Sequence, residues 1–153
     1  MATIFATETG AVSFESRPIS VELGRLDRLD QEAMRLELDR VLYSELSPLA
    51  PAEALSAEGM LSWFRDAADR VLRSVFEAAH QGLCGEEGKD LRNAVLAAAG
   101  IAGGAALIAS GLVSLGIGTA LATAVSAWIY KFIVKPSGKA FCEHWADSLP
   151  EGV

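Results

Sequence analysis

The sequence predicts a mainly α-helical protein that ends in a hydrophobic helical hairpin, and three observations lead to this fold class. The stretch from Asn93 to Tyr130 contains no Asp, Glu, Lys or Arg, although these residues make up 22% of the chain. Serine and glycine interrupt this stretch near its middle, and two upstream stretches repeat apolar residues at helical spacing. The charge-free run is about twice the ~20 apolar residues that cross a bilayer as a helix, so we expect a transmembrane hairpin.

Composition narrows the function classes. The chain has 153 residues, a formal net charge of -7 and a mean hydropathy of +0.29. An acidic chain lacks the basic face that binds phosphates, which argues against a nucleic-acid partner. Its first residues lack the basic and apolar regions of a secretory signal, and two cysteines are too few for a disulfide framework. We therefore expect a cytosolic body.

The amino-terminal part, residues 1–23, is predicted to form two or three short strands. The segments 3–7 and 11–15 are rich in β-branched and aromatic residues, and Glu8-Thr9-Gly10 between them suits a hairpin turn. After Pro18, the segment 19–23 alternates apolar and polar residues once more. This pattern predicts a short N-terminal β-hairpin with one further strand.

Two amphipathic helices are predicted next, at about 25–46 and 52–81. Pro48 and Pro51 separate them, because proline cannot continue a helix. The polar residues that follow the second helix form a linker, so a body over 1–88 precedes a hairpin over 89–135 and a short tail over 136–153. The arms of the hairpin are expected at about 94–113 and 117–134, with Ser114, Gly116 and Gly118 at its turn.

Residues that flank the hairpin fit a membrane interface. Arg92 lies just before it, and Trp128, Tyr130, Lys131 and Lys135 lie at its far end. Lysine and arginine favour the cytoplasmic side, and aromatic rings favour the headgroup layer. This pattern predicts an inner (cytoplasmic) membrane location with both termini cytoplasmic and the lipid bilayer as partner.

Small residues along the hairpin are spaced for close helix packing or for lining a pore. They include a G-x-x-x-G motif in the first arm and a stripe of hydroxyl groups in the second: Gly100, Gly103, Gly104, Ser110, Gly111, Thr119, Thr123 and Ser126. Such faces could close the hairpin on itself or pack several copies together, and we expect a homo-oligomer. In pattern alone, over roughly the last third of the chain and without a diagnostic motif, this Ala/Gly-rich hairpin resembles the one carried by colicin-type pore formers.

Motifs for catalysis and cofactors are missing from the sequence. There is no P-loop, G-x-S-x-G or H-E-x-x-H motif, and the glycines at 100–104 lack the context of a dinucleotide loop. We therefore expect no enzyme activity, no cofactor and no metal. One weak alternative is a zinc site of His80, Cys84, Cys142 and His144, whose spacing matches no familiar finger. A Cys84–Cys142 disulfide is equally weak, and free thiols are favoured.

Three functions remain open at this point. The leading hypothesis is a non-enzymatic membrane-acting protein, like a pore-forming toxin or defence effector, whose hairpin inserts, oligomerises and permeabilises the bilayer. The first alternative is a membrane-anchored scaffold or small subunit of a larger complex, which binds a partner through its N-terminal strands or amphipathic helices. The second alternative is a soluble helical protein that buries the hairpin as its core, since a helix that is apolar all round can be a protein core.

Overall fold

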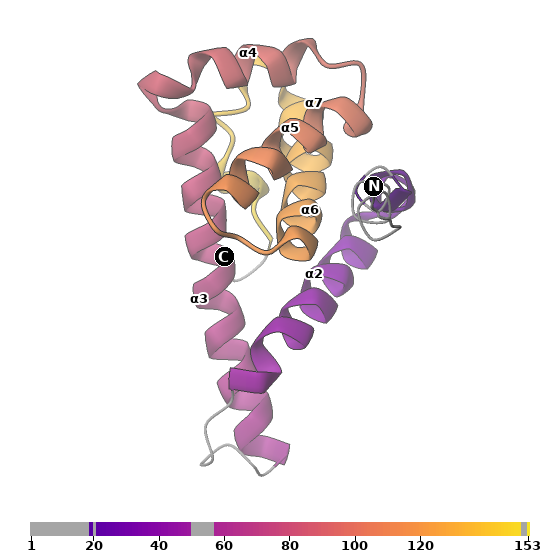
Figure 1. The fold of residues 1–153 in the computed structure, drawn as a ribbon, viewed down its shortest axis with the longest axis vertical. Helices are drawn as coiled ribbons and strands as arrows, with labels where there is room; N and C mark the ends of the chain where they lie inside the picture. The colour runs from indigo at the N-terminus through magenta and orange to yellow at the C-terminus, as the bar shows by residue number, and fades with distance from the viewer. Residues whose placement is uncertain (1–18, 20, 50–56, 151–152) are drawn as a thin grey trace, which may run out of the picture.

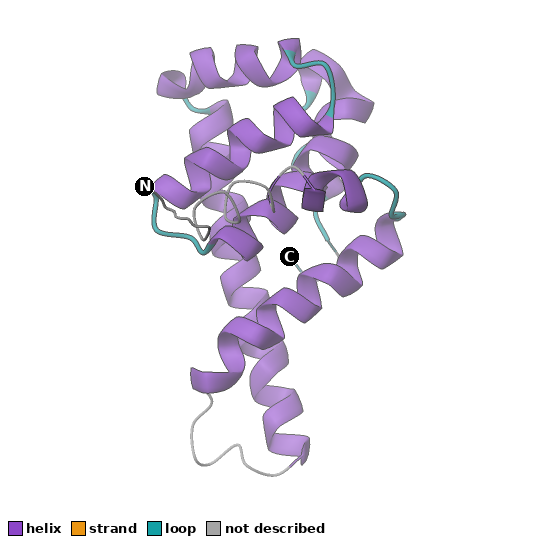
Figure 2. Ribbon diagram, turned by 45° about the vertical axis from the view of Figure 1, so that its right-hand side comes forward, coloured by secondary structure: helices purple, strands orange, loops and turns teal. Residues whose placement is uncertain are grey.

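The computed structural model describes residues 19, 21–49, 57–150 and 153, and side chains from residue 62 onward in the third helix. These residues form helices, turns and loops, and no strand occurs among them (Figure 2). A short helical segment at 21–26 comes first. The later elements are α2 (Gln31–Leu46), η1 (Ser47–Leu49), α3 (Ala57–Cys84), η3 (Glu86–Gly88), α4 (Lys89–Ala97), α5 (Ile101–Ser114), α6 (Thr119–Trp128), the π-helical η4 (Ile129–Val134), α7 (Lys135–Ser137), η5 (Gly138–Ala140) and η6 (Ala146–Ser148).

The helices form a wedge around the hairpin. α2 and α3 contact each other at the lower end of the molecule and diverge upward, and α5 and α6 lie between their upper halves (Figure 1). α6 packs on α2, α5 packs on α3, and the two hairpin helices pack on each other. α4 crosses the top of the molecule and contacts both α3 and α5.

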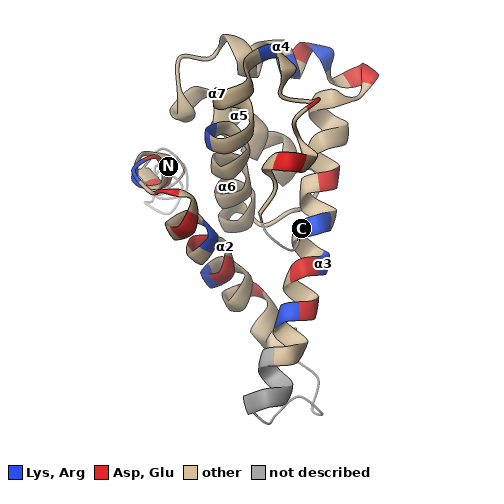
Figure 3. Cartoon of the chain, turned by 180° about the vertical axis from the view of Figure 1, so that it is seen from behind, with Lys and Arg blue, Asp and Glu red and all other residues tan. Residues whose placement is uncertain are grey.

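The core combines apolar side chains from every long helix. Its largest fully buried side chains are Trp128, Phe76, Phe141, Leu23, Leu26, Met34, Leu38, Leu42, Leu72, Leu83 and Ile129. The charged residues concentrate on α2, α3 and α4, while α5 and α6 carry none (Figure 3). The charged amphipathic helices therefore turn their apolar faces toward the charge-free hairpin, which removes apolar surface from water on both sides.

The strand predicted at 19–23 is wrong, because residues 21–26 are helical. The β-hairpin predicted over 3–15 lies outside the described residues. Leu23 and Leu26, three residues apart, are both almost fully buried, which is helical spacing and not the alternation of a strand. The alternation of apolar and polar residues at 19–23 covers only five residues, which is too short to distinguish the two-residue period of a strand from the 3.6-residue period of a helix.

The helix predicted over 25–46 is interrupted. Turn residues at Asp27-Arg28 end the first segment, and α2 begins after Asp30, whose carboxylate accepts a hydrogen bond of 2.8 Å from the Ala33 backbone N–H. Asp30 is thus the N-cap of α2, a position that aspartate favours because it satisfies a free N–H of the first turn. This break turns the 21–26 segment away from the axis of α2.

The transmembrane hairpin is also wrong. Among the described residues, no helix combines the length and the apolarity needed to cross a bilayer. The first predicted arm breaks at residues 98–100, where Ala98 has an extended backbone, and this leaves α5 with 14 residues, or about 21 Å of helix. The predictions of a membrane location and of a transmembrane, pore-forming hairpin rest on that span, and they are corrected with it.

The hairpin instead serves as the centre of a helical bundle. α6 is buried on all sides from Leu121 to Trp128, and α5 buries Ile101, Gly104, Ala105, Ile108, Ala109 and Leu112. The chain reverses between these helices at 115–118, where Gly116 has a φ of 95° that glycine adopts without strain. A charge-free helix is therefore explained here by protein packing on all its sides.

Candidate ligand-binding cavity between α2 and α6

A cavity of about 560 Å³ lies where the 21–26 segment, α2 and α6 meet. The residues that line it are Ile19, Glu22, Leu26, Glu37, Arg40, Val41, Thr119, Ala120, Thr123 and Ala124. Leu26, Val41 and Ala124 form buried apolar parts of the wall. The volume falls within the roughly 300–1,000 Å³ that is typical of small-molecule sites.

The local sequence explains why the cavity exists. α6 presents small side chains toward α2: Thr119, Ala120, Thr123 and Ala124 follow one another on one side of the helix at spacings of one, three and one. Small residues leave space that larger ones would fill. The break at Asp27–Asp30 places Leu26 and Glu22 across from α2, so the 21–26 segment supplies the third wall.

A network of charged residues lies along one edge of the cavity. Arg25 hydrogen-bonds both oxygens of Glu22, at 2.9 and 2.6 Å, and both oxygens of Glu37, at 3.1 and 3.0 Å. Arg40 adds hydrogen bonds of 3.3 and 2.9 Å to Glu37. Paired, planar contacts of this kind fix the positions of the carboxylates, and they tie the 21–26 segment to α2.

The network changes the acidity of its members. Hydrogen bonds from Arg25, and further ones from Arg40, lower the pKa of Glu37 to about 2. The hydrogen bonds from Arg25 also lower the pKa of Glu22, and the two carboxylates in turn raise the pKa of Arg25. Both carboxylates beside the cavity are therefore ionised at neutral pH.

The hydroxyl stripe predicted in the second arm runs from the cavity into the core. Thr119 and Thr123 line the cavity, and the Thr123 hydroxyl donates to the Thr119 carbonyl at 2.7 Å. Ser126 lies one turn farther along the same side, fully buried, and its hydroxyl has no partner among the described residues. Two of the three residues of the predicted hydroxyl stripe thus line a cavity within one chain.

Of the glycines predicted for helix packing, Gly104 lies in close contact with the second arm, and the others have different surroundings. Gly104 is buried beneath the Tyr130 ring, so closely that a Cβ atom there would overlap the ring. Gly111 borders a smaller apolar cavity of about 200 Å³ between α3, α4 and α5. Gly100 precedes α5, while Gly103 and Ser110 are exposed on it. Close approach is therefore seen between Gly104 and the second arm.

The turn residues lie outside the cavity. Ser114 closes α5, and its hydroxyl donates to the Gly111 carbonyl at 2.7 Å. Gly116 lies in the reversal itself, and Gly118 caps α6. A Cβ atom on Gly118 would lie 3.3 Å from Glu45 Oε2, so the end of α2 contacts the start of α6 here.

The residues assigned to a membrane interface make contacts within the protein. Trp128 is 1% exposed, and its indole N–H donates to the Ser148 carbonyl at 3.0 Å. The Lys131 ammonium donates to the carbonyls of Asp27, at 2.6 Å, and Leu29. Tyr130 packs on α5 at Gly104. All three side chains are therefore engaged in contacts within the chain.

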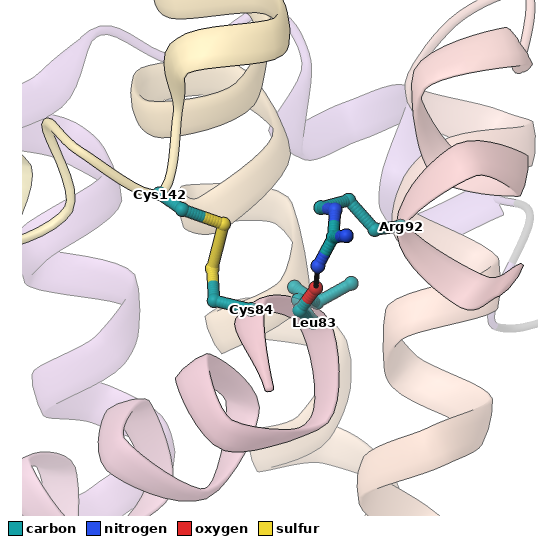
Figure 4. Close-up of a disulfide and its surroundings, with 4 residues drawn as sticks. All are labelled: Leu83, Cys84, Arg92 and Cys142. Carbon is teal, nitrogen blue, oxygen red and sulfur yellow. Dashed lines mark hydrogen bonds between the residues drawn. A yellow bond between two sulfur atoms is a disulfide. The ribbon is translucent and has the colours of Figure 1, made fainter. Parts of the chain in front are cut away.

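Of the other two residues assigned to the membrane interface, Arg92 makes a contact within the protein and Lys135 is exposed. Arg92 donates to the Leu83 carbonyl at 2.9 Å (Figure 4). Its guanidinium thereby satisfies a carbonyl in the last turn of α3, which the helix itself leaves free. Lys135 is exposed on α7. Arg92 therefore joins α4 to α3, as Lys131 joins η4 to the loop before α2.

The two cysteines are joined in a disulfide, whereas the sequence favoured free thiols. Cys84 ends α3 and Cys142 follows η5, with Cα atoms 5.9 Å apart (Figure 4). Disulfide sulfurs are not available as zinc thiolates, and His80 instead packs edge-on against Trp145 with ring centroids 5.1 Å apart. His144 is exposed. In the described part of the chain, no three His, Cys, Asp or Glu side chains are grouped to hold a metal ion.

Sequence reasoning missed the cavity and its charged edge. Arg25 and Glu37 are 12 residues apart, and the break at Asp27–Asp30 brings them together. The signal for that break was present, since Asp30 is a favoured N-cap residue before a run of helix formers. The chain matches no known protein family, no curated protein and no solved structure, so no relative assigns a role to this site.

Proposed function

We propose that the protein is a non-enzymatic binding protein that holds a small, largely apolar molecule in the α2–α6 cavity. The observation that carries this proposal is the cavity itself, which combines apolar walls, small side chains on α6 and a charged edge on one side. Binding sites for small molecules are typically apolar, with a few fixed polar groups that set orientation. The proposal agrees with the second alternative from the sequence, a helical protein that buries the hairpin as its core. It adds a role in binding a small molecule.

The groups around the cavity favour binding over catalysis. A general base works best with a pKa near the operating pH, and the pKa of Glu37 is about 2. Glu22 also has a lowered pKa and is held by Arg25. The Thr123 hydroxyl is engaged with the Thr119 carbonyl. Fixed, fully ionised carboxylates suit the orientation of a ligand.

A filled cavity tests the proposal. Ala120 is an exposed residue that lines the cavity, so Ala120→Trp should occupy the space without disturbing the core. Ala102→Trp is the matched control, because Ala102 is exposed on α5 and does not line the cavity. The probe is N-phenyl-1-naphthylamine, a neutral apolar dye whose fluorescence rises on transfer from water. We expect Ala120→Trp to weaken dye binding at least about tenfold, and Ala102→Trp to leave it unchanged. Equal binding by all three proteins would contradict the proposal.

A second candidate function is self-association through exposed apolar side chains of α2 and η1. Leu36 and Tyr43 lie two helical turns apart on α2 and are 65% and 54% exposed, although the Tyr43 ring also packs edge-on against Phe64 of α3, and Leu49 in η1 is 69% exposed. Large apolar side chains gathered on one face are typical of interaction surfaces. Light scattering over a range of concentrations tests self-association. Leu36→Glu should abolish any dimer, and Leu107→Glu on α5 is the matched control.

A further inference from the structure

We infer that the partner of the exposed face of α2 is a second copy of this chain, and that the two α2 helices pair antiparallel about a two-fold axis at Leu36. This inference rests on the second candidate function, self-association, and adds the orientation and the register of the contact. It follows from the exposure of Leu36, from a hollow beside that residue and from the symmetric charges around it.

The exposed face of α2 consists of four exposed residues at helical spacing: Glu32, Leu36, Arg40 and Tyr43. Steps of four, four and three residues place them in one stripe along the helix. α2 itself lies on the outside of the molecule in the views of Figures 1 and 3. A single exposed leucine is ordinary on a protein surface, so the features beside Leu36 are needed to identify an interface.

A hollow of about 300 Å³ adjoins Leu36. It is lined by Gln31, Glu32, Arg35 and Leu36, together with the buried Trp128. When two helices pair, a side chain of one enters a hole formed by four residues of the other. In a contact centred on Leu36, this leucine of each copy enters the hollow of the opposite copy, and both leucines leave water.

Charges of opposite sign lie at equal distances on either side of Leu36. Glu32 is four residues before it, and Arg40 is four residues after it. An antiparallel two-fold contact therefore sets Glu32 of each copy opposite Arg40 of the other, which gives two complementary pairs. A parallel contact would set Glu32 against Glu32 and Arg40 against Arg40, and like charges disfavour it. The charge pattern thus selects the antiparallel orientation.

Both charged side chains are able to form the pair. In the described part of the chain, Glu32 has no hydrogen bond or ion pair. The Arg40 side chain is 63% exposed, and its hydrogen bonds to Glu37 come from Nε and Nη2, which leaves the donors of Nη1 available. Glu37 also keeps both of its hydrogen bonds from Arg25. The contact between copies therefore needs no break in the network within each chain.

The contact is small, and this sets the expected affinity. α2 has 16 residues, which is about 24 Å of helix. Interfaces that bury less than about 1,200 Å² are typical of weak or transient complexes. We therefore expect a dissociation constant on the order of 100 μM, measured by light scattering over a range of concentrations.

Single cysteines in the full chain test the register. Leu36→Cys places a thiol on the two-fold axis, where oxidation should join it to the thiol of the other copy. Tyr43→Cys is the matched control, because its two thiols lie about 21 Å apart along the helices, and a disulfide needs Cα atoms within about 7 Å. The natural cysteines do not interfere, since they are joined to each other. We expect Leu36→Cys to link at least about tenfold faster than Tyr43→Cys.

Charge reversal tests the orientation. Glu32→Arg alone should weaken the dimer about tenfold, because it replaces both complementary pairs with like charges, and Arg40→Glu should do the same. The double variant Glu32→Arg, Arg40→Glu should return to within about threefold of the natural affinity. It does not restore the contact between Arg40 and Glu37, so its recovery reports pairing between copies. Lys135→Glu, at an exposed position on α7, is the control for a change of net charge.

The outcomes separate this inference from the candidate function on which it rests. Faster linking of Tyr43→Cys than of Leu36→Cys, or a double variant as weak as the single variants, would overturn the antiparallel contact at Leu36. Self-association would still stand in that case if light scattering shows a dimer. A protein that stays monomeric at about ten times the expected dissociation constant would overturn both.

Discussion

The guanidinium of Arg25 bridges two carboxylates from different segments, and its contacts to Glu37, at 3.1 and 3.0 Å, hold the 21–26 helix against α2. The two carboxylates that Arg25 joins, Glu22 and Glu37, both line the α2–α6 cavity. The architecture of the site therefore depends on a contact between residues that are remote in sequence, while its floor depends on the small side chains of α6.

The first prediction concerns pH. The pKa of Glu37 falls from its ordinary 4.5 to about 2, so the carboxylate stabilises the fold above about pH 4.5 and loses that contribution as the pH falls toward 2. Because the network is partly solvated, we expect a loss of about 1–2 kcal/mol in the free energy of unfolding. Urea unfolding at about pH 6, 4 and 2.5 measures it. Glu37→Gln should remove this part of the pH dependence, and identical curves for both proteins would contradict it.

The second prediction concerns the disulfide. The bond between Cys84 and Cys142 spans 58 residues of sequence, a stretch that includes α4, α5 and α6. Loop-closure entropy for a loop of that size gives a stabilisation of about 4 kcal/mol. Reducing agent should lower the free energy of unfolding of the natural protein by that amount. The double variant Cys84→Ser, Cys142→Ser should start lower and not respond to reductant, and an unchanged midpoint for the natural protein on reduction would count against the bond.

The third prediction concerns the close approach of α5 to the second arm. A methyl group at Gly104 would overlap the Tyr130 ring, so Gly104→Ala should destabilise the fold by about 1–3 kcal/mol as the ring is displaced. Gly103→Ala is the matched control, because Gly103 is exposed and its Cβ would meet the Ala98 methyl at 3.4 Å. That variant should be neutral or slightly stabilising, since alanine favours helix over glycine. Thermal unfolding of the two variants side by side decides the point.

The fourth prediction separates a structural lysine from a surface lysine. Lys131 donates to the carbonyls of Asp27 and Leu29, which the turn before α2 leaves without helical partners, and Lys135 is exposed. Lys131→Ala should therefore cost about 1–3 kcal/mol, and Lys135→Ala less than about 0.5 kcal/mol. Equal effects in chemical unfolding would show that the Lys131 contacts do not contribute.

Some of this fold was readable from the sequence. The apolar spacing from Met34 to Leu42 requires a buried helix face, and the structure buries both residues in α2. Absence of charge between Asn93 and Tyr130 indicates removal from water, but protein and lipid are both apolar surroundings. Two features distinguish a buried hairpin from a transmembrane one here: the break at Ala98 and the packing of α2 and α3 on the hairpin. Neither feature can be recognised from the local sequence of an alanine-rich run.

The candidate site was harder to predict than the fold. Thr119 and Thr123 stood out in the sequence as small polar residues in an apolar helix, and the structure places both in the cavity wall. Glu22 and Glu37, which also line the cavity, were not singled out from the sequence, because charged residues usually face solvent. Only a three-dimensional arrangement shows that these two carboxylates share one arginine.

The most direct test of the central claim is a decanol titration followed by methyl NMR on the full-length protein. The binding account predicts saturable shifts at Leu26 and Val41, which line the α2–α6 cavity, and no comparable shifts at Leu83 and Ile108, which line the smaller apolar cavity. Ala120→Trp should remove the shifts, and Ala102→Trp should preserve them. Shifts centred on Leu83 and Ile108, or none at any methyl group, would contradict the assignment of the α2–α6 cavity as the binding site.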